Sequence, residues 1–138
     1  MIVADTNLIA YLWIPGDHTS EAEHLLRQDS EWAVPLLWRS EFRNILAGAV
    51  RSGKLSLGLA VQLAEEAERL VAGKEYSVPS PRVLEAAIQS QCSAYDCEFV
   101  VLAEDLGVSL VTMDREILKA FPKRAVSIKQ FLGGRSIP

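Results

Sequence analysis

The sequence is poor in cysteine and histidine, the side chains that form disulfides and bind zinc. Its 138 residues include two cysteines and two histidines. Cys92 and Cys97 have four residues between them, which matches neither a C-x-x-C motif nor a zinc-ligand pair. His18 and His24 stand apart from other candidate ligands. The sequence therefore predicts reduced thiols, as in a cytoplasmic protein, and neither a disulfide framework nor a zinc site.

Long apolar runs are also missing. No stretch reaches the run of about 18 apolar residues that a transmembrane helix requires. The amino terminus lacks the basic residues that open a signal peptide, and Asp5 interrupts its apolar run. We therefore expect a protein without a membrane segment.

Charge is unevenly distributed along the chain. The formal net charge of −4 excludes a protein that binds polyanions over its whole surface. Residues 115–138 carry six basic side chains and one acidic side chain, a net +5, whereas residues 1–114 carry eight basic and seventeen acidic side chains, a net −9. The basic segment is interpreted either as a solvated surface, which composition alone favours, or as a site for a phosphate-bearing substrate.

The hydrophobic content of the sequence is typical of a globular domain. With 49% hydrophobic residues the chain can bury one sizeable core, and we predict a single domain over residues 1–138. Short apolar runs alternate with longer amphipathic stretches, without repeats or low-complexity linkers. This alternation predicts a three-layer α/β/α sandwich around a mostly parallel central sheet. The predicted strands are residues 2–4, 32–35, 76–78, 110–112 and 125–128.

Cap and turn residues delimit the predicted helices. Ser20 and Glu23 form a capping-box pattern that predicts a helix through Gln28. Further helices are predicted over residues 37–52, 56–73, 82–91, 93–106 and 115–121. The first two of these five form a helical pair, or clip, on one side of the sheet, and its exposed apolar positions are candidates for a partner surface. The residues expected to face inward in the second helix of the pair are Leu59, Leu63, Ala67 and Leu70.

The opening stretch places a carboxylate at the end of a buried strand. Residues 2–4 form an apolar run typical of a strand buried on both faces, and Asp5 follows it directly. Thr6 and Asn7 suit the change from strand to helix. Open α/β sheets bind ligands at the carboxyl ends of such strands, so Asp5 is interpreted as the first member of an acidic metal cluster. The alternative is an N-cap of the following helix.

Two further acids are candidates for the same cluster. Asp114 follows a later apolar strand just as Asp5 follows the first. Glu41 lies near a largely apolar stripe of its predicted helix, where a carboxylate is costly unless a cation meets it. The alternative for Glu41 is an ion pair with Arg39 or Arg43 on a solvated face. Spacing alone leaves both interpretations open.

Three more acidic residues lie near these positions. Asp96 stands in the first turn of a predicted helix, where an anion is favoured by the helix dipole, and it fits a capping box with Ser93. Glu98 and Glu116 are interpreted as exposed helix residues. Asp96 is therefore the one of the three that we carry forward as a candidate site residue.

Four short motifs occur in order along the chain. They are D-T-N at residues 5–7, S-E at 40–41, A-Y-D-x-x-x-V-x-L-A at 94–103 and L-V-T-x-D-R at 110–115. Together they resemble the PIN-domain ribonucleases, and most closely the VapC-type toxins of bacterial and archaeal toxin–antitoxin pairs. The resemblance covers essentially the whole chain. It implies an acidic quartet formed by Asp5, Glu41, Asp96 and Asp114.

The resemblance also implies an activity and partners. It implies a metal-dependent endoribonuclease that hydrolyses RNA to leave a 5′-phosphate and a 3′-hydroxyl, a small cognate antitoxin that holds the toxin inactive, and a homodimer. Asp5, Asp96 and Asp114 are the expected ligands of Mg²⁺ or Mn²⁺. Glu41 is expected to act as a ligand or beside the ligands, with Thr112 and Asn7 in support. The hypothesised phosphate contacts are Arg115, Lys119 and Arg39.

The chemistry explains why such a cluster would be needed. Phosphodiester hydrolysis must stabilise negative charge on phosphorus, activate a water and help an alkoxide to leave, and divalent ions can do all three. Hard cations prefer oxygen ligands, which fits a site of Asp and Glu without His or Cys. Four converging carboxylates without a metal would repel one another. The cluster therefore makes physical sense mainly as an ion site.

Two other classes of function are compatible with parts of the sequence. The first is a non-catalytic binding module that keeps the fold and acts through partner contacts, although the full quartet argues against it. The second is another α/β protein with an acidic pocket, such as a phosphotransfer receiver or a haloacid-dehalogenase-like phosphatase. The latter requires D-x-D after the first strand, where this chain has D-T-N, so the second class fits poorly.

Overall fold

Short strands form a parallel sheet at the centre of the protein. The computed structural model describes residues 1–136. The strands in this range are β1 (Ile2–Ala4), β2 (Trp32–Pro35), β3 (Glu75–Tyr76), β4 (Leu110–Val111) and β5 (Ala125–Val126). Their order is β3-β2-β1-β4-β5, and all neighbouring pairs run parallel. The predicted α/β fold with a mostly parallel sheet is confirmed, and the described sheet is parallel throughout.

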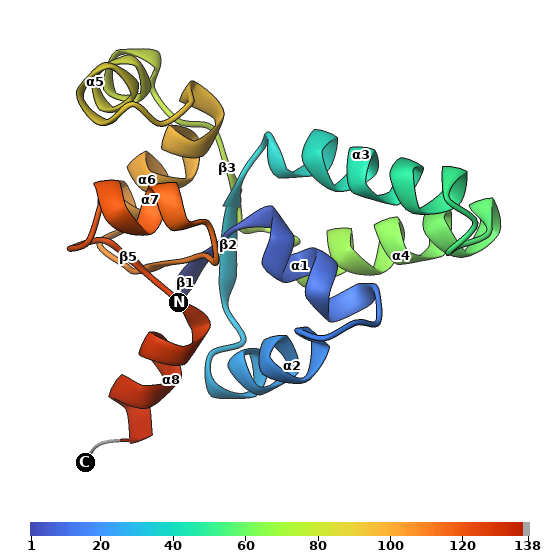
Figure 1. The fold of residues 1–138 in the computed structure, drawn as a ribbon. Helices are drawn as coiled ribbons and strands as arrows, with labels where there is room; N and C mark the ends of the chain where they lie inside the picture. Colours follow the sequence, from blue (N-terminus) through green and yellow to red (C-terminus); the bar gives the residue numbers. More distant parts are fainter. Residues whose placement is uncertain (137–138) are drawn as a thin grey trace.

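Helices cover both faces of this sheet and complete the three layers (Figure 1). One side carries α1 (Thr6–Trp13), α2 (Thr19–Gln28), α3 (Trp38–Arg51) and α4 (Leu57–Leu70). The other side carries α5 (Ser80–Ser90), α6 (Ala94–Leu106) and α7 (Arg115–Ala120). The last helix, α8 (Ile128–Ser136), follows β5 and packs against α2. Among the described helices, none has the length and apolar character needed to cross a bilayer.

β1 can occupy the centre of the sheet because all its residues are apolar and buried in the core. Residues 2–4 are buried, as the opening apolar run predicted. Val3 is paired with Ala33 of β2 on one side and with Leu110 of β4 on the other. α6 contacts β1 and β2 and contains an unbroken buried run, residues 99–103. A helix that is apolar on most sides fits this place because it lies between the sheet and α5.

The predicted capping box at the start of α2 is wrong. α2 begins at Thr19, so Ser20 lies inside the helix and does not cap it with Glu23. The Thr19 hydroxyl instead accepts the Gly16 N–H at 3.0 Å and donates to the Tyr11 carbonyl at 2.7 Å. The turn between α1 and α2 therefore sets the helix start, which a local sequence pattern did not reveal.

Two other helices differ from the predicted boundaries. α5 begins at Ser80, before the predicted start at Arg82. The last predicted strand extends too far, because Ile128 opens α8, a helix that we did not predict. The Ser127 hydroxyl accepts the Gln130 N–H at 3.1 Å, and the Gln130 side-chain oxygen accepts the Ser127 N–H at 2.9 Å. These reciprocal bonds are a capping box, which accounts for the change from strand to helix.

α3 and α4 form the predicted helical pair on one side of the sheet (Figure 1). The predicted inward face of α4 is only partly right. Ala67 is buried and Leu63 and Leu70 are half-buried, but Leu59 is 42% exposed and Ala60 is buried beside it. Ala60 and Ala67 are separated by two helical turns, so they lie on one stripe of the helix and Leu59 lies outside it.

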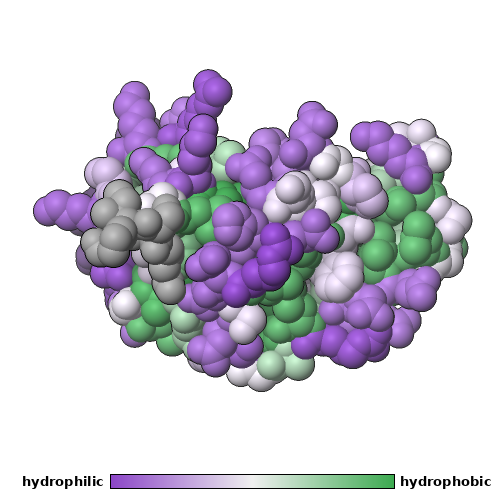
Figure 2. Space-filling view, turned by 90° about the horizontal axis from the view of Figure 1, so that it is seen from below, coloured by the Kyte–Doolittle hydropathy of each residue, from purple (hydrophilic) through white to green (hydrophobic). Residues whose placement is uncertain are grey.

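A groove of about 500 Å³ runs along this helical pair. Leu57 and Val61 line it, and these residues are 69% and 50% exposed. In Figure 2, hydrophobic residues gather toward the right of the molecule, where Figure 1 places the pair. The charged residues of the groove are Arg43 and Arg51 from α3 and Glu65 and Glu68 from α4. The pair therefore presents an apolar surface bordered by both signs of charge.

An ion pair joins α3 to the edge strand β3. The Arg39 guanidinium donates from Nε to Glu75 Oε2 at 2.7 Å and from Nη2 to Oε1 at 2.9 Å. The Trp38 indole N–H donates to the same carboxylate at 2.6 Å, and Glu68 of α4 lies 3.3 Å from the guanidinium. The hydrogen bond from Arg39 is the largest cause that lowers the pKa of Glu75 below its ordinary value, against the opposing effect of burial.

We predict that Glu75→Gln lowers the free energy of unfolding by about 1 to 2 kcal/mol at neutral pH, because Arg39 loses its bidentate carboxylate. The pKa of Glu75 is lower in the folded than in the unfolded protein. Its contribution to stability is therefore complete above the unfolded pKa and is lost as the pH falls through the folded pKa. Urea unfolding from neutral to acidic pH measures this, and the two proteins should converge at the acidic end.

The matched control is Glu66→Gln, which removes a carboxylate paired with Arg69 on the surface of α4. It should change the free energy of unfolding by less than about 1 kcal/mol. A stability difference for Glu75→Gln that stays constant at every pH would contradict the assigned ion pair.

Candidate active site

The ends of β1 and β4 bring three of the predicted site residues together. The two strands are parallel neighbours, so Asp5 and the segment after β4 meet at the same edge of the sheet. The Thr112 hydroxyl donates to Asp5 Oδ2 at 2.6 Å and accepts the Asp114 N–H at 3.0 Å. Because Thr112 is 0% exposed, water does not compete for these bonds. A buried hydroxyl thus connects the first strand to the acidic turn after β4.

The two aspartates use their carboxylates differently. Asp5 occupies the N-cap position of α1, but its side chain makes no cap hydrogen bond. The interpretation of Asp5 as a side-chain cap is therefore wrong, and its carboxylate faces Thr112 instead. Asp114 is a true N-cap of α7, since its Oδ1 accepts the N–H groups of Glu116 at 2.9 Å and of Ile117 at 3.1 Å.

Glu41 reaches the same edge from the first turn of α3. Its Oε1 accepts the hydroxyl of the buried Thr6 at 2.7 Å. The alternative ion pairs are wrong for the described residues: Arg39 binds Glu75, and no bridge joins Glu41 to Arg43. The Glu41 carboxylate is therefore held by the start of α1 and not by a neighbouring cation.

The four predicted acids line one cavity of about 240 Å³. Asp96 enters it from the first turn of α6, where its backbone N–H donates to Ser93 Oγ at 3.0 Å, one half of the capping box predicted there. The residues that line the cavity are Asp5, Thr6, Asn7, Glu41, Asn44, Ile45, Asp96 and Asp114. Acids that are far apart in the sequence thus meet at one rim of the sheet, although they come from four different segments.

Asn44 lines the cavity but was not among the predicted site residues. It follows Glu41 by about one helical turn, so the two side chains lie on the same face of α3. That spacing was visible in the sequence, but an uncharged amide gave no reason to select it. Of the supporting residues, Asn7 lines the cavity and Thr112 lies behind Asp5. The proposed phosphate contacts, which do not line the cavity, are Arg39, Arg115 and Lys119.

Burial and mutual repulsion disfavour the charged forms of these acids. Burial raises the pKa of Asp5, and the charges of Asp114 and Asp96 raise it further. The hydrogen bond from Thr112 offsets only part of this effect. Burial also raises the pKa of Glu41, with further contributions from the charges of Asp5 and Asp96. The cluster is electrostatically unfavourable by itself, so it favours a positively charged ligand.

The oxygen donors suit a hard divalent cation that keeps part of its water. Mg²⁺ and Mn²⁺ prefer carboxylate and amide oxygens, and the cavity lining contains neither sulfur nor imidazole. Within residues 1–136, however, no three His, Cys, Asp or Glu side chains lie close enough to form a ready-made ligand set. Mg²⁺ commonly binds through one or two carboxylates and retains several waters. A hydrated ion therefore fits this cavity better than an ion enclosed by protein.

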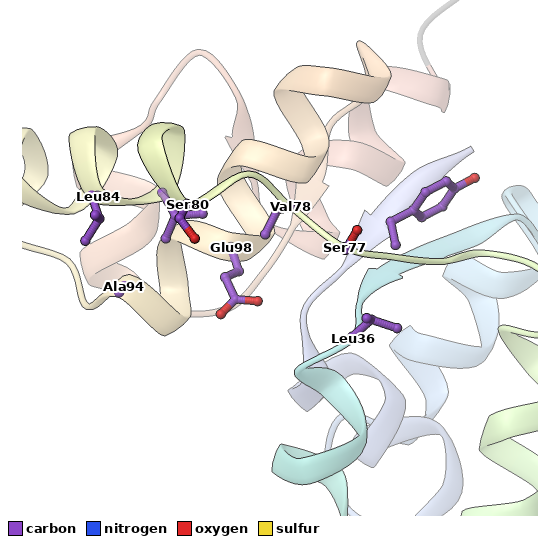
Figure 3. Close-up of a pocket in the computed structure, with 9 residues that line it drawn as sticks. Leu36, Ser77, Val78, Ser80, Leu84, Ala94 and Glu98 are labelled. Carbon is purple, nitrogen blue, oxygen red and sulfur yellow. The ribbon is translucent and has the colours of Figure 1, made fainter.

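Glu98 lies outside the acidic cavity, in a neighbouring cleft of about 370 Å³. Leu36, Val78 and Leu84 contribute apolar walls to this cleft, and Ser80 lies at the start of α5. Figure 3 shows the Glu98 carboxylate pointing toward the open space between α5 and the segment around Leu36. Burial raises the pKa of Glu98. Glu98 is thus close enough to influence Glu41 electrostatically without lining the same cavity.

Comparisons with known proteins identify the family of the chain. A family model described as the PIN domain matches residues 2–123. The chain is 31% identical over 124 residues to a protein named ribonuclease VapC3 from Pyrobaculum aerophilum, a match that covers 88% of this chain and 95% of that protein.

Two solved structures share the fold. A crystal structure of a protein from Pyrobaculum aerophilum superposes with a TM-score of 0.77 at 22% identity, covering 99% of this chain and 90% of that one. A toxin–antitoxin complex from Klebsiella pneumoniae contains a chain with a TM-score of 0.63 at 17% identity, covering 93% of this chain and 98% of that one. The resemblance seen in the four motifs is confirmed, and the chain belongs to the PIN-domain family.

Proposed function

We propose that the protein is a metal-dependent endoribonuclease that hydrolyses RNA phosphodiester bonds and acts as the toxin of a toxin–antitoxin pair. The observation that carries the proposal is the single cavity lined by Asp5, Glu41, Asp96 and Asp114 at the carboxyl ends of β1 and β4. The similarity to a protein named as a ribonuclease supports the same chemistry.

The proposed roles follow from the positions of the side chains. Asp5, Asp96 and Asp114 would hold Mg²⁺ or Mn²⁺, which when bound stabilises charge on the phosphate and makes a coordinated water more acidic. Thr112 fixes the direction of the Asp5 carboxylate, and Thr6 fixes that of Glu41. We assign to Glu41, together with the amides of Asn7 and Asn44, the orientation of water and substrate at the cavity wall.

The proposed phosphate contacts divide into two groups. Arg39 is hydrogen-bonded to Glu75 and lies beside Glu68, so a phosphate would have to displace two carboxylates. Its role as an RNA contact is therefore not retained in the proposal. Arg115 and Lys119 are exposed on α7, next to the cavity residue Asp114, and are retained.

A small antitoxin is the proposed protein partner. The groove along α3 and α4 supports this, because an apolar surface with Leu57 and Val61 exposed favours burial by another chain. Both signs of charge border the groove, so an amphipathic helix with complementary charges is the partner of suitable chemistry. We propose a cytoplasmic location on the evidence of Cys92 and Cys97, which are both free and buried.

A homodimer is also proposed. Apolar residues of α5 and of the segments near it remain exposed, in contrast to the buried core, and two of them, Leu36 and Leu84, line the Glu98 cleft. These residues are Leu36 (55% exposed), Leu84 (59%), Ile88 (80%) and Tyr95 (63%). Leu84 and Ile88 are one helical turn apart, so they share a face of α5 that a second copy of the chain can cover.

A non-catalytic binding module remains the alternative. The absence of a ready-made three-ligand set within residues 1–136 favours it, as do the exposed apolar surfaces. Calorimetric titration with Mg²⁺ and Mn²⁺ separates the two proposals. Saturable binding that is lost in Asp5→Asn supports the nuclease, whereas no binding to the parent protein supports the module.

We predict that Asp5→Asn lowers RNA cleavage by more than about 100-fold, because it removes a charged metal ligand at the centre of the cavity. EDTA should abolish cleavage by the parent protein, and added Mg²⁺ or Mn²⁺ should restore it. Single-turnover cleavage of total cellular RNA by purified, antitoxin-free protein measures both effects. The control is Asp17→Asn, an exposed carboxylate in the turn before α2. Cleavage that survives EDTA or Asp5→Asn would refute the assigned site.

Thr112→Val should lower cleavage by about 10- to 100-fold, because Asp5 and the Asp114 N–H lose a common hydrogen-bond partner. Thr112→Ser keeps the hydroxyl and should retain most of the activity. The metal concentration that gives half-maximal cleavage should rise for Val and stay near the parent value for Ser. Equal losses in the two variants would mean that packing, and not the hydroxyl, supports the site.

Ile88→Glu should convert a dimer into a monomer, because it places a charge at the centre of the proposed interface. Sedimentation equilibrium over a range of protein concentrations measures the change. Val61→Glu provides the control, since it introduces the same charge at an exposed apolar position in the groove along α3 and α4. A parent protein that is monomeric at every concentration, or a dimer unaffected by Ile88→Glu, would rule out this interface.

A further inference from the structure

The basic surplus of the C-terminal segment begins beside the acidic cavity. Residues 115–138 contain six basic residues and one acidic residue, whereas residues 1–114 contain eight and seventeen. α7 starts directly after Asp114, whose carboxylate caps the helix and lines the cavity. Arg115 therefore directly follows a residue of the cavity lining, at the first position of α7.

Three exposed basic residues follow one another from this point. Arg115 and Lys119 are four positions apart and share the outer face of α7, while Ile117 is buried against the core. Lys123 lies in the turn that follows the helix and is also exposed. All three therefore lie on α7 or in the turn after it, in the segment that directly follows the cavity residue Asp114. We call Arg115, Lys119 and Lys123 the basic row.

The basic row is not neutralised by the protein itself. Among the described residues, none of its three members takes part in a salt bridge, whereas Arg39, Arg69 and Arg82 elsewhere are each paired with a carboxylate. Two acids adjoin Arg115 in the sequence: Asp114, whose Oδ1 caps α7, and Glu116, which is exposed. The neighbouring Arg124 is used internally, since its Nη1 donates to the Val108 carbonyl at 3.0 Å.

We propose that the basic row binds successive phosphates of the RNA strand that flanks the bond to be cleaved, with the strand running from the acidic cavity along α7. The proposal rests on the proposed ribonuclease function and adds the path of the substrate. The row lies outside the cavity lining, so its members bind flanking phosphates and not the scissile one. Separate exposed cations with no enclosed cavity between them suit a chain of repeated charges better than a single small anion.

The test measures binding separately from cleavage. Labelled single-stranded RNA is titrated against Asp5→Asn protein by fluorescence anisotropy at several salt concentrations. Removing all three charges (Arg115→Gln, Lys119→Gln and Lys123→Gln together) should reduce the steepness of log K against log salt by about 2, since each phosphate contact on a single strand contributes about 0.7. The loss of affinity should be larger for a long strand than for a short one that covers only the cavity.

Three controls accompany the triple variant. Lys54→Gln removes an exposed lysine between α3 and α4, at the opposite end of α3 from the cavity residue Glu41, and should leave the slope unchanged. Glu116→Gln removes the acid within the row and should strengthen binding. The charge-conserving set of Arg115→Lys, Lys119→Arg and Lys123→Arg should keep most of the slope, because charge and not shape is required.

The outcomes separate this proposal from the function on which it rests. A triple variant that binds RNA with the slope of the parent overturns the basic row, even where the parent cleaves RNA. A parent that binds RNA with the expected slope but never cleaves it overturns the nuclease and leaves the row standing.

Discussion

The hydrogen bonds of the Thr112 hydroxyl are the contacts on which the candidate site depends most. They join Asp5, at the end of β1, to the turn that carries Asp114, although 107 residues separate Thr112 from Asp5. They can form only because the chain, after building β2 and β3 on one side of β1, returns to place β4 on the other side. The site therefore lies where the strand order reverses, which is the place where open α/β sheets bind ligands.

The structure separates its carboxylates into two electrostatic situations. Glu75 meets Arg39, and this contact lowers its pKa, so the carboxylate stabilises the junction of α3 and β3. Glu41 stands only two positions after Arg39 in α3, yet it turns toward Thr6 at the start of α1 and its pKa is raised. No basic side chain lines the acidic cavity among the residues that the structure describes. A cation that balances these acids must therefore come from solution, which is the electrostatic condition for a metal site.

The sequence predicted what depends on strong local signals and failed where tertiary contacts decide. Apolar strands followed directly by Asp5 and Asp114 identified both the sheet and the acidic rim, because burial and charge are visible in single residues. The predicted start of α2 was wrong because the hydrogen bond from the Thr19 hydroxyl to the Tyr11 carbonyl outweighs the capping-box pattern of Ser20 and Glu23. α8 was missed although Ser127 and the glutamine three positions later formed a capping box. Spacing along the helix left Arg39 as a possible partner of Glu41, and only the folded structure shows that its side chain binds Glu75 instead.

The uneven charge of the chain resolves a difficulty for a protein of net charge −4 that is proposed to bind RNA. An acidic cavity repels a phosphodiester until a divalent ion occupies it, so the cavity cannot attract the substrate from a distance. Residues one turn apart on α7 are separated by about 6 Å along the helix, less than the screening length of about 8 Å at physiological salt. Because α7 directly follows the cavity residue Asp114, the proposed attraction by Arg115 and Lys119 acts next to the cavity. In the proposed function, attraction and catalysis are divided between neighbouring surfaces, because one set of side chains cannot carry both signs of charge.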